Sequence, residues 1–490
     1  MSRVAVRRSK HRLLPDARRV IAAPFVDDVA VPPDDSRAGL LIRRILAIPE
    51  AQVDLLLQGI RADFSLRHRA FDEILERHFE LVAHRVGPTA HLSRERRLLI
   101  GAYFTHEYSV ESAALFNPSM VLAPDQDNVR PGERRFVMSL RAVGEGHISS
   151  IEFRSGIIDA MSNLTFDPPG SQLVTGRRSP PSHYDKRQFR TKLTELGVGN
   201  ELAWGVLARL SERFTLTELE RSLALLEEDD SPPAISYETA KIIRVLAASN
   251  YVTSFPPESA LAERVIFPAG PYETRGMEDA RFVRFMENGS VAKYYATYTA
   301  FDGFEILPQL IETEDFTSLT ISTLNGSAAQ NKGMALFPRQ IDGMYVMLSR
   351  KDRENLHLAT SKDVRFWNDV TELYEPSKSW ELRHIGNCGA PMETDAGWLV
   401  LTHGVGPMRR YAIGALLLDL EDPRRVLGHL PEPLLVPDET EREGYVPNVL
   451  YSCGGMINGD RLVLPYGFSD YGIGIAAISL PELLAELRKG

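Results

Sequence analysis

A turn residue followed by a short apolar strand recurs along this 490-residue chain, and this repeat constrains the fold more than any other feature. The turn residues of the five copies are Gly132, Gly289, Gly343, Gly397 and Gly459. From 289 to 343 is 54 residues, from 343 to 397 is 54, and from 397 to 459 is 62. This period is typical of blade-shaped sheets, which close radially around a central funnel. We therefore predict a mainly β chain that forms a five-bladed β-propeller.

Helical patterns interrupt the repeat in two places. Apolar spacing predicts an all-helical front piece from about 36 to 115, and the distance from Gly132 to Gly289 is about 100 residues longer than the period. Within that gap, residues 187–250 show helical spacing, and Thr215 with Glu218 matches a capping box. We predict an N-terminal tail and helical region over 1–115, and a propeller catalytic domain over 116–490 with a helical insertion at about 187–250, after the first blade. The helical insertion is expected either over the binding face or in subunit contacts, so a homo-oligomer formed through the helical regions stays open.

The basic N-terminus has two interpretations. Residues 1–19 hold seven Lys and Arg residues against Asp16, a pattern that an arm binding nucleic acid or membrane would show. We favour a mobile solvated tail. The whole chain carries a net charge of -10, which argues against a general nucleic-acid binder but leaves room for a local anion site.

Composition predicts a cytoplasmic enzyme. The only cysteines, Cys388 and Cys453, are too few for a disulfide framework and lack the paired spacing of a zinc site, which indicates a reducing compartment. No stretch approaches the length of a membrane span, and no apolar signal-peptide core follows the basic N-terminus. We expect no membrane partner, no nucleic-acid partner and no cofactor. His147, His384 and His403 lack ligand spacing, so no metal is predicted.

The sharpest chemical feature is a pair of carboxylates, Glu278 and Asp279, between Arg275 and Arg281 at the start of a strand. A salt-bridged junction between blades would explain it without any function. Alternatively, burial at the bottom of a funnel keeps one carboxylic acid protonated while an arginine tunes its pKa, which is what acid catalysis of acetal cleavage requires, with Asp279 as the proton donor.

These residues also carry a family resemblance. The run from Gly276 to Arg281 resembles the Glu-Asp-Pro-Arg signature of glycoside hydrolase family 130, the β-mannoside phosphorylases and β-mannosidases. Further matches, in the family's order, are Asn331–Arg339, Thr402–Val405, Glu443–Val449 and Tyr466–Asp470. The similarity covers about residues 116–485. The fold of that family is a five-bladed propeller, in agreement with the repeat.

The resemblance implies inverting cleavage of a terminal β-mannosidic linkage in a small manno-oligosaccharide, with the residue matching Asp279 as general acid, often acting through a sugar hydroxyl. In a phosphorylase, inorganic phosphate is the co-substrate and the product is α-mannose 1-phosphate. The phosphate would be held by charge-assisted bonds from Arg141, Lys332 and Arg350.

Several polar and aromatic side chains are the expected sugar ligands. They are Asn117, Arg141, Glu278, Arg281, His403, Tyr445 and Asp470. Turn capping would equally explain Asn117 and Asp470. Tyr445 would either stack on a sugar ring or pack in the core.

One departure from the family pattern leaves a hydrolase as the alternative to a phosphorylase. Many family phosphorylases have a His-Arg-Pro run after the third repeat strand, where this chain has Ser349 to Asn355, so a phosphate-binding histidine is missing. A hydrolase would need a base about 6.5–9.5 Å from the acid, and Glu354 and Glu381 are the candidates. We favour phosphorolysis over hydrolysis.

Two other classes share the architecture. Five-bladed furanosidases place a catalytic aspartate in the first blade, where this chain has Asn117-Pro118 without an aspartate, which counts against them. A non-catalytic carbohydrate-binding propeller remains an alternative, because a fold does not determine a function.

Overall fold

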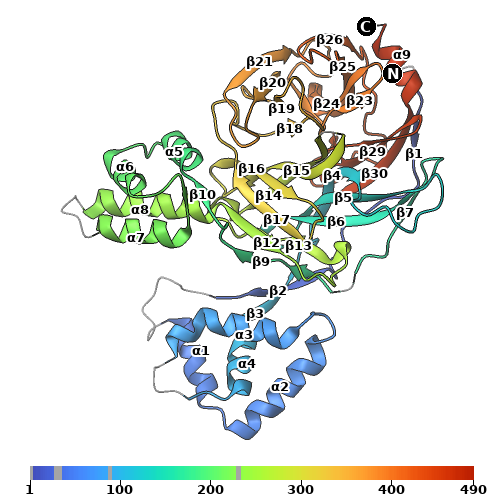
Figure 1. Cartoon of the computed structure of the whole chain (residues 1–490). Helices are drawn as coiled ribbons and strands as arrows, with labels where there is room; N and C mark the ends of the chain where they lie inside the picture. Colours follow the sequence, from blue (N-terminus) through green and yellow to red (C-terminus); the bar gives the residue numbers. More distant parts are fainter. Residues whose placement is uncertain are drawn as a thin grey trace.

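The computed structural model describes residues 4–26, 36–86, 91–170, 172–227, 233–287 and 289–489, and it is mainly β with two separate groups of helices (Figure 1). The prediction of a mainly β chain is confirmed. Each of the five turn glycines leads into or begins a strand, namely β5 (Arg134–Val143), β15 (Ser290–Phe301), β19 (Tyr345–Ser349), β24 (Gly397–Val405) and β29 (Arg461–Phe468).

The first two sets of antiparallel strands belong to one twelve-stranded sheet. The first set is β4 (Ala114–Leu122), β5, β6 (Ser149–Ile158) and β7 (Leu164–Phe166). The second is β14 (Gly276–Glu287), β15, β16 (Ile306–Thr313), β17 (Ser318–Thr323), β12 (Tyr251–Ser254) and β9 (Arg177–Ser179). A single parallel pair, Gly276 with Ser149, joins the two sets through β14 and β6. β13 (Arg264–Ile266) also pairs with β6, and β8 (Val174–Thr175) pairs with β13.

Three further sheets follow along the chain. A four-stranded sheet holds β18 (Ala335–Leu336), β19, β20 (Leu356–Ser361) and β21 (Asp369–Tyr374). The next holds β22 (His384–Asn387), β23 (Met392–Thr394), β24, β25 (Tyr411–Leu418) and β26 (Val426–His429). The last holds β27 (Leu450–Tyr451), β28 (Met456–Asn458), β29 and β30 (Gly472–Ser479), with β1 (Val6–Arg8) added to its edge.

The Asp342-Gly343 turn shows how local sequence sets the register. Both residues have positive φ, 50° and 71°, and Ile341 pairs with Met344 across them. This is the two-residue hairpin geometry that Asp-Gly favours, because its twist matches the twist of the flanking strands.

Buried apolar side chains fill the spaces between successive sheets. One cluster joins β4–β6 to β14–β17, a second joins β14–β16 to β18–β20, and a third joins β19–β20 to β22–β25. A fourth joins β24–β25 to β29–β30, and a fifth joins β28–β30 back to β4–β7. The first and last sheets are therefore neighbours in space.

The front helices are α1 (Arg37–Leu46), α2 (Glu50–Phe64), α3 (Phe71–Val82) and α4 (Arg94–Tyr103). The Ser36 and Ser93 side chains cap α1 and α4 by accepting from the backbone N–H groups of Gly39 and Arg96. The expectation of an all-helical piece up to 115 is wrong at its end. Thr105–Ser109 forms β3, which pairs with β2 (Val20–Pro24), and the Tyr108 side chain of β3 is buried.

The second helical group comprises α5 (Lys186–Glu195), α6 (Glu201–Ala208), α7 (Leu216–Glu227) and α8 (Pro233–Ala248), and it projects from one side of the β body (Figure 1). The capping box is present: Thr215 Oγ1 accepts from Glu218 N at 3.3 Å, and Thr215 N donates to Glu218 Oε2 at 2.8 Å. A short pair of β10 (Tyr184–Asp185) with β11 (Arg213–Phe214) closes the group, and α9 (Leu480–Leu487) ends the chain's secondary structure. Among the described helices, none has the length and apolar content needed to cross a membrane.

The N-terminal segment packs against the β body, so the expectation of a mobile solvated tail over residues 1–19 is wrong for residues 4–19, and residues 1–3 lie outside the described residues. Val6 pairs with Ile478 of β30, which extends the last sheet. Arg19 is 6% exposed and contacts Glu152 at 2.6 Å and Glu111 at 2.9 Å. Arg154 contacts the same two carboxylates, so two guanidinium groups and two carboxylates form one buried network.

Replacing Arg19 by Met should lower the free energy of unfolding by about 3–5 kcal/mol, because two buried carboxylates would retain only one cationic partner. Arg18→Met is the matched control, since the Arg18 side chain is 90% exposed and should leave the stability nearly unchanged. Urea unfolding of both variants measures the difference, and equal stabilities would contradict the importance of the buried network.

Candidate active site

Side chains from the first two strand sets meet at Asp279 of β14. Asn117 Nδ2 donates to Asp279 Oδ1 at 2.7 Å, and Arg141 Nη1 lies 3.3 Å from the same oxygen. Asn117 and Asp279 both have positive φ, 48° and 56°, and each lies at a break in strand register. Such bulges re-aim a side chain out of the regular alternation, and strained backbone of this kind is concentrated at functional sites.

Glu278 holds two of the predicted basic residues. Its Oε1 accepts from Arg141 Nη2 at 2.8 Å, and its Oε2 contacts Lys332 Nζ, from the segment before β18. The carboxylate pair is therefore ion-paired, but the partners come from other strands and not from Arg275 and Arg281 beside it. Arg281 is buried and donates to the Asp279 carbonyl oxygen at 3.0 Å and to the Tyr451 hydroxyl at 2.5 Å.

The pKa of Asp279 is below its ordinary value. Burial alone would raise this pKa, but the positive charges of Arg141, Arg281 and Lys332 and the hydrogen bond from Asn117 outweigh burial. The carboxyl group is thus ionised at neutral pH. The expectation that burial keeps Asp279 protonated is wrong, because cations from three different segments surround it.

Asp470 shows the opposite shift. Burial raises the pKa of Asp470 to about 6, the positive charge of Arg141 opposes this shift, and the negative charge of Asp279 adds to it. Asp470 lies in the turn between β29 and β30 with a positive φ of 48°. The last sheet therefore places a second carboxyl group near Asp279, and its pKa is shifted in the opposite direction.

A second group of predicted residues surrounds His403 of β24. Arg350 Nη1 lies 3.4 Å from His403 Nε2, and His403 Nδ1 lies 3.1 Å from the Asn387 carbonyl oxygen, to which it donates. Burial, together with the positive charge of Arg350, keeps the pKa of His403 well below its usual value, so the ring is neutral. Its ring lies 4.7 Å from that of Tyr451, the partner of Arg281, which connects this group to the first.

Polar atoms near Arg350 are left without partners. Arg350 Nε and His384 Nε2 are buried and lack a hydrogen-bond partner within the described part of the chain. Burial, followed by the charges of Arg350 and Arg383, lowers the pKa of His384 to about 4. Buried polar groups normally have partners, so these two nitrogen atoms are suited to accommodate a ligand.

Sequence reasoning missed His384, Asn387 and Tyr451 as site residues. Asn387 and Tyr451 lie 10 and 8 residues before the repeat turns at Gly397 and Gly459, and these comparable positions could have identified them. Asn387 Nδ2 donates to the Gly333 carbonyl oxygen, which connects β22 to the Lys332 segment.

Other predicted residues lie apart from these two groups. Tyr445 is 69% exposed and stacks on His147 with ring centroids 5.4 Å apart, so the alternative of core packing is wrong. Glu354 is exposed. Glu381 is buried, and its Oε1 accepts from the Tyr374 hydroxyl at 2.9 Å and from the Ser377 backbone N–H at 3.0 Å. These contacts give Glu381 a role in holding a turn.

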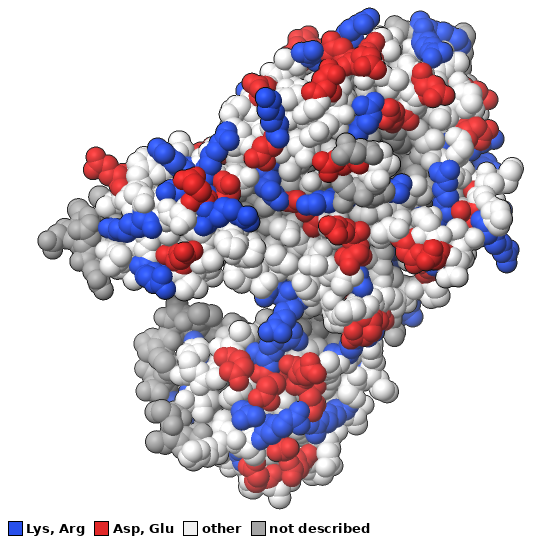
Figure 2. Space-filling model, in the orientation of Figure 1, with Lys and Arg blue, Asp and Glu red and all other residues white. Residues whose placement is uncertain are grey.

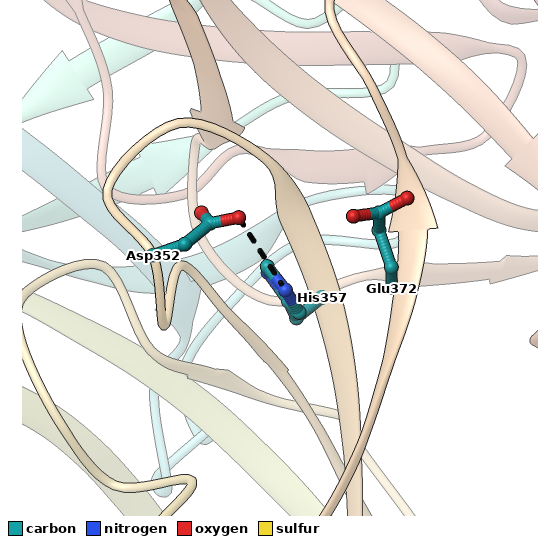
Figure 3. Close-up of side chains that lie close together, drawn as sticks. All are labelled: Asp352, His357 and Glu372. Carbon is teal, nitrogen blue, oxygen red and sulfur yellow. Dashed lines mark ion pairs between the residues drawn. The ribbon is translucent and has the colours of Figure 1, made fainter.

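Among the described residues, one set of metal-type ligands lies close together at the turn after β19 and on β20 and β21. Asp352, His357 and Glu372 have ligand atoms within 4.8 Å of one another, with His357 between the two carboxylates (Figure 3). Both carboxylates are exposed, and Asn355 Nδ2 donates to each of them, at 2.8 Å and 3.3 Å. The cluster has no contact with Asp279 or His403 in the described structure, and the expectation of no metal stays a prediction.

Comparison with known proteins gives three findings. Residues 256–489 match the profile of glycoside hydrolase family 130, described as beta-1,4-mannooligosaccharide phosphorylase. A 1,2-beta-oligomannan phosphorylase of Thermoanaerobacter sp. (strain X514) is 34% identical over 43% of this chain and 71% of its own length. A beta-1,2-mannobiose phosphorylase of Listeria innocua serovar 6a is 32% identical over 46% of this chain and 63% of its own length.

Among solved structures, the complex of beta-1,2-mannobiose phosphorylase from Listeria innocua with beta-1,2-mannobiose covers 78% of this chain and 94% of its own, with a TM-score of 0.45 and 22% identity. Since a relative that is 34% identical is covered over 71% of its length, and its family's profile matches residues 256–489, the chain belongs to glycoside hydrolase family 130.

Proposed function

We propose that this protein cleaves terminal β-mannosidic linkages of manno-oligosaccharides by phosphorolysis and releases α-mannose 1-phosphate. The observation that carries the proposal is the set of cations around one carboxylate. Arg141, Arg281 and Lys332 together hold the pKa of Asp279 down. With Arg350 beside His403, the cations of the site outnumber the carboxyl groups of Glu278, Asp279 and Asp470. This excess of positive charge suits a phosphate ion better than a single uncharged sugar. The relatives that carry phosphorylase names support the same activity.

The ionised state of Asp279 fits a reaction in which the attacking hydrogen phosphate supplies the proton. An oxygen of hydrogen phosphate attacks the anomeric carbon, and the bond from that carbon to the bridging oxygen breaks. The phosphate loses one proton as it becomes an ester, and the leaving sugar oxygen gains one, so the protons balance. Asp279 passes this proton on, directly or through a sugar hydroxyl, because its carboxylate can accept a proton before it donates one.

Bound phosphate also changes the electrostatics of the acid. An anion that pairs with Arg141 and Lys332 offsets the effect of their positive charges on Asp279. The pKa of Asp279 then rises toward the range in which the carboxyl group carries a proton. Arg350, His384 and the neutral His403 would supply further hydrogen bonds, because Arg350 Nε and His384 Nε2 have no partner within the described residues.

The sugar would be held by polar groups from the first and last sheets. Asn117 Oδ1 is buried and without a hydrogen-bond partner among the described residues, which leaves it free to accept from a sugar hydroxyl. Asp470 supplies a carboxylate above pH 6. Tyr445 is exposed and stacks on His147, and it would offer an aromatic face to a sugar ring.

We further propose that the strand sets are the blades of a five-bladed propeller. The five intersheet clusters support this arrangement, since each sheet packs on two neighbours and the fifth cluster joins the last sheet to the first. The catalytic domain would run from about 116 to 490, with the front helices before it and α5–α8 inserted after the first blade. Cys388 and Cys453 are buried and free, which fits a reducing, cytoplasmic location.

The first test is phosphate dependence. Incubation with β-1,2- or β-1,4-mannobiose should give mannose 1-phosphate only when phosphate is present, and chromatography of the products measures it. The β-1,2 substrate should react faster, in line with the names of two relatives. Free mannose at equal rates with and without phosphate would contradict phosphorolysis and identify a hydrolase.

Asp279→Asn should lower kcat by about 10²–10⁴-fold, because the amide can neither take nor give the catalytic proton. Asp460→Asn is a matched control, since the Asp460 side chain is 71% exposed and lies on the β28–β29 turn. Steady-state kinetics and thermal melting of both variants separate a catalytic loss from a folding loss. Unchanged turnover in Asp279→Asn would remove the proposed acid.

Asp470 should impose an acidic limb on the pH profile. Its pKa is raised to about 6, so below that pH it is protonated and can accept fewer hydrogen bonds from the sugar. We expect kcat/KM to fall about tenfold per pH unit below pH 6 in the wild type. Asp470→Asn should have a lower kcat/KM without that limb, and an unaltered limb in the variant would assign the titration to another group.

A further inference from the structure

A cavity of about 580 Å³ lies between α3 of the front helices and the strands β2, β8 and β12. Most of its lining residues precede residue 256, where the family match begins. None of the described residues that line the cavity belongs to the candidate active site. Whatever the cavity binds is therefore separate from the catalytic groups.

The cavity is strongly cationic. Arg69, Arg77, Arg177 and Arg178 line it, and Glu73 is the carboxylate among its described lining residues. Figure 2 shows Lys and Arg side chains in the hollow between the front helices and the β body. His78 adds no charge at neutral pH, because burial and then the charge of Arg77 lower its pKa to about 4. This excess of positive charge stands out in a chain with a net charge of -10.

Two of the four arginines are already engaged. Arg69 Nη2 contacts Glu263 Oε2 at 2.8 Å. Arg178 lies over the Tyr251 ring at 4.5 Å and donates to the Phe267 carbonyl oxygen. These contacts hold both guanidinium groups at the wall of the cavity.

The other two arginines are available. Arg77 and Arg177 are exposed, and neither forms a hydrogen bond or ion pair through its side chain with another residue in the described ranges. Arg77 lies on α3 and Arg177 on β9, so they approach the cavity from its two sides. Glu73 is one turn before Arg77, yet no ion pair within 4.0 Å joins them in the described structure.

We propose that this cavity is a binding site for a small phosphate-bearing anion, either inorganic phosphate or a sugar phosphate. Planar guanidinium groups bind phosphate oxygens in a bidentate manner, and low-dielectric walls strengthen the interaction. Leu173, Phe255 and Phe267 supply such walls, and they would contact the carbon-bound hydrogens of an attached sugar. The anion would connect α3 to β9, and hence the front helices to the twelve-stranded sheet.

Isothermal titration calorimetry of the full chain with inorganic phosphate and with mannose 1-phosphate tests the proposal. Arg350→Ala serves as background, because it weakens phosphate binding at the candidate active site without touching the cavity. In that background, Arg77→Ala/Arg177→Ala should weaken binding of the anion at least tenfold, since two unpaired cationic partners are lost. Arg134→Ala/Arg209→Ala is the control, with two exposed arginines lost elsewhere and the same change in net charge.

The outcomes separate the two ligands and the two sites. Binding of inorganic phosphate that only the cavity variant loses identifies free phosphate, and binding of mannose 1-phosphate alone identifies the ester. Equal binding by the cavity variant and the control would overturn the proposal, as would no binding of either ligand in the Arg350→Ala background. Loss of turnover in Arg350→Ala reports on the proposed function alone, so the two proposals can fail independently. Both arginines of the cavity pair are exposed, and melting temperatures without ligand confirm that the variants fold.

Discussion

The packing of the last sheet on the first is the constraint on which the site depends. Leu115 and Met138 of the first sheet share a buried cluster with Val463 and Ile475 of the last, which lie 325–360 residues further along the chain. Backbone contacts reinforce it, since Cys453 N donates to the Pro118 carbonyl oxygen at 2.8 Å. Burial of apolar surface contributes roughly 25 cal/mol per Å², so an interface of several large side chains offsets the entropy of closing so long a loop. Without it, Asp470 and Tyr451 would not reach Asp279.

Electrostatic balance is the second constraint, because Asp279 and Glu278 lie between cations from different segments of the chain, namely β5 and the segment before β18. Arg141 contacts both carboxylates, and Lys332 contacts Glu278 from the other side. Breaking a buried pair by removing one partner costs more than the pair contributes, so these residues are mutually dependent. The same arrangement leaves Asp470 as the carboxyl group with a raised pKa. Asp279 and Asp470 thus lie in one site with pKa values shifted in opposite directions, a pattern typical of sites that transfer protons.

Local signals in the sequence were sufficient to predict one strand in each of the five strand sets and the start of one helix. The turn glycines predicted β5, β15, β19, β24 and β29, and Thr215 with Glu218 predicted the start of α7, because these features depend on neighbouring residues only. Pairings across long distances were not predictable in this way. Val6–Arg8 pairs with a strand about 470 residues away, and Thr105–Ser109 pairs with Val20–Pro24, so each strand forms because its partner offers an edge.

In the site, too, residue types were predictable from local sequence, whereas protonation states were not. Residue types in the motif segments pointed to Asp279, Lys332 and His403, whereas the protonation state of Asp279 depends on how many cations other strands bring to it. No pattern in one segment holds that information, since Arg141 and Lys332 are 138 and 53 positions from Asp279 in the sequence. Likewise, the position of Glu381 in the sequence made it a candidate base. Only the fold shows that its carboxylate accepts hydrogen bonds from Tyr374 and Ser377 in a turn.

The N-terminal region attaches to the β body through charge as well as through strands. The network of Arg19, Arg154, Glu111 and Glu152 neutralises its charges internally, which explains why it can be buried. The cavity beneath α3 differs, because arginines outnumber carboxylates among its described lining residues, and Arg77 and Arg177 are exposed. A junction that needed only stability would pair these arginines, as the neighbouring network does. Unpaired positive charge held between two parts of a protein instead favours an anion that binds both, and such binding would stabilise their relative position.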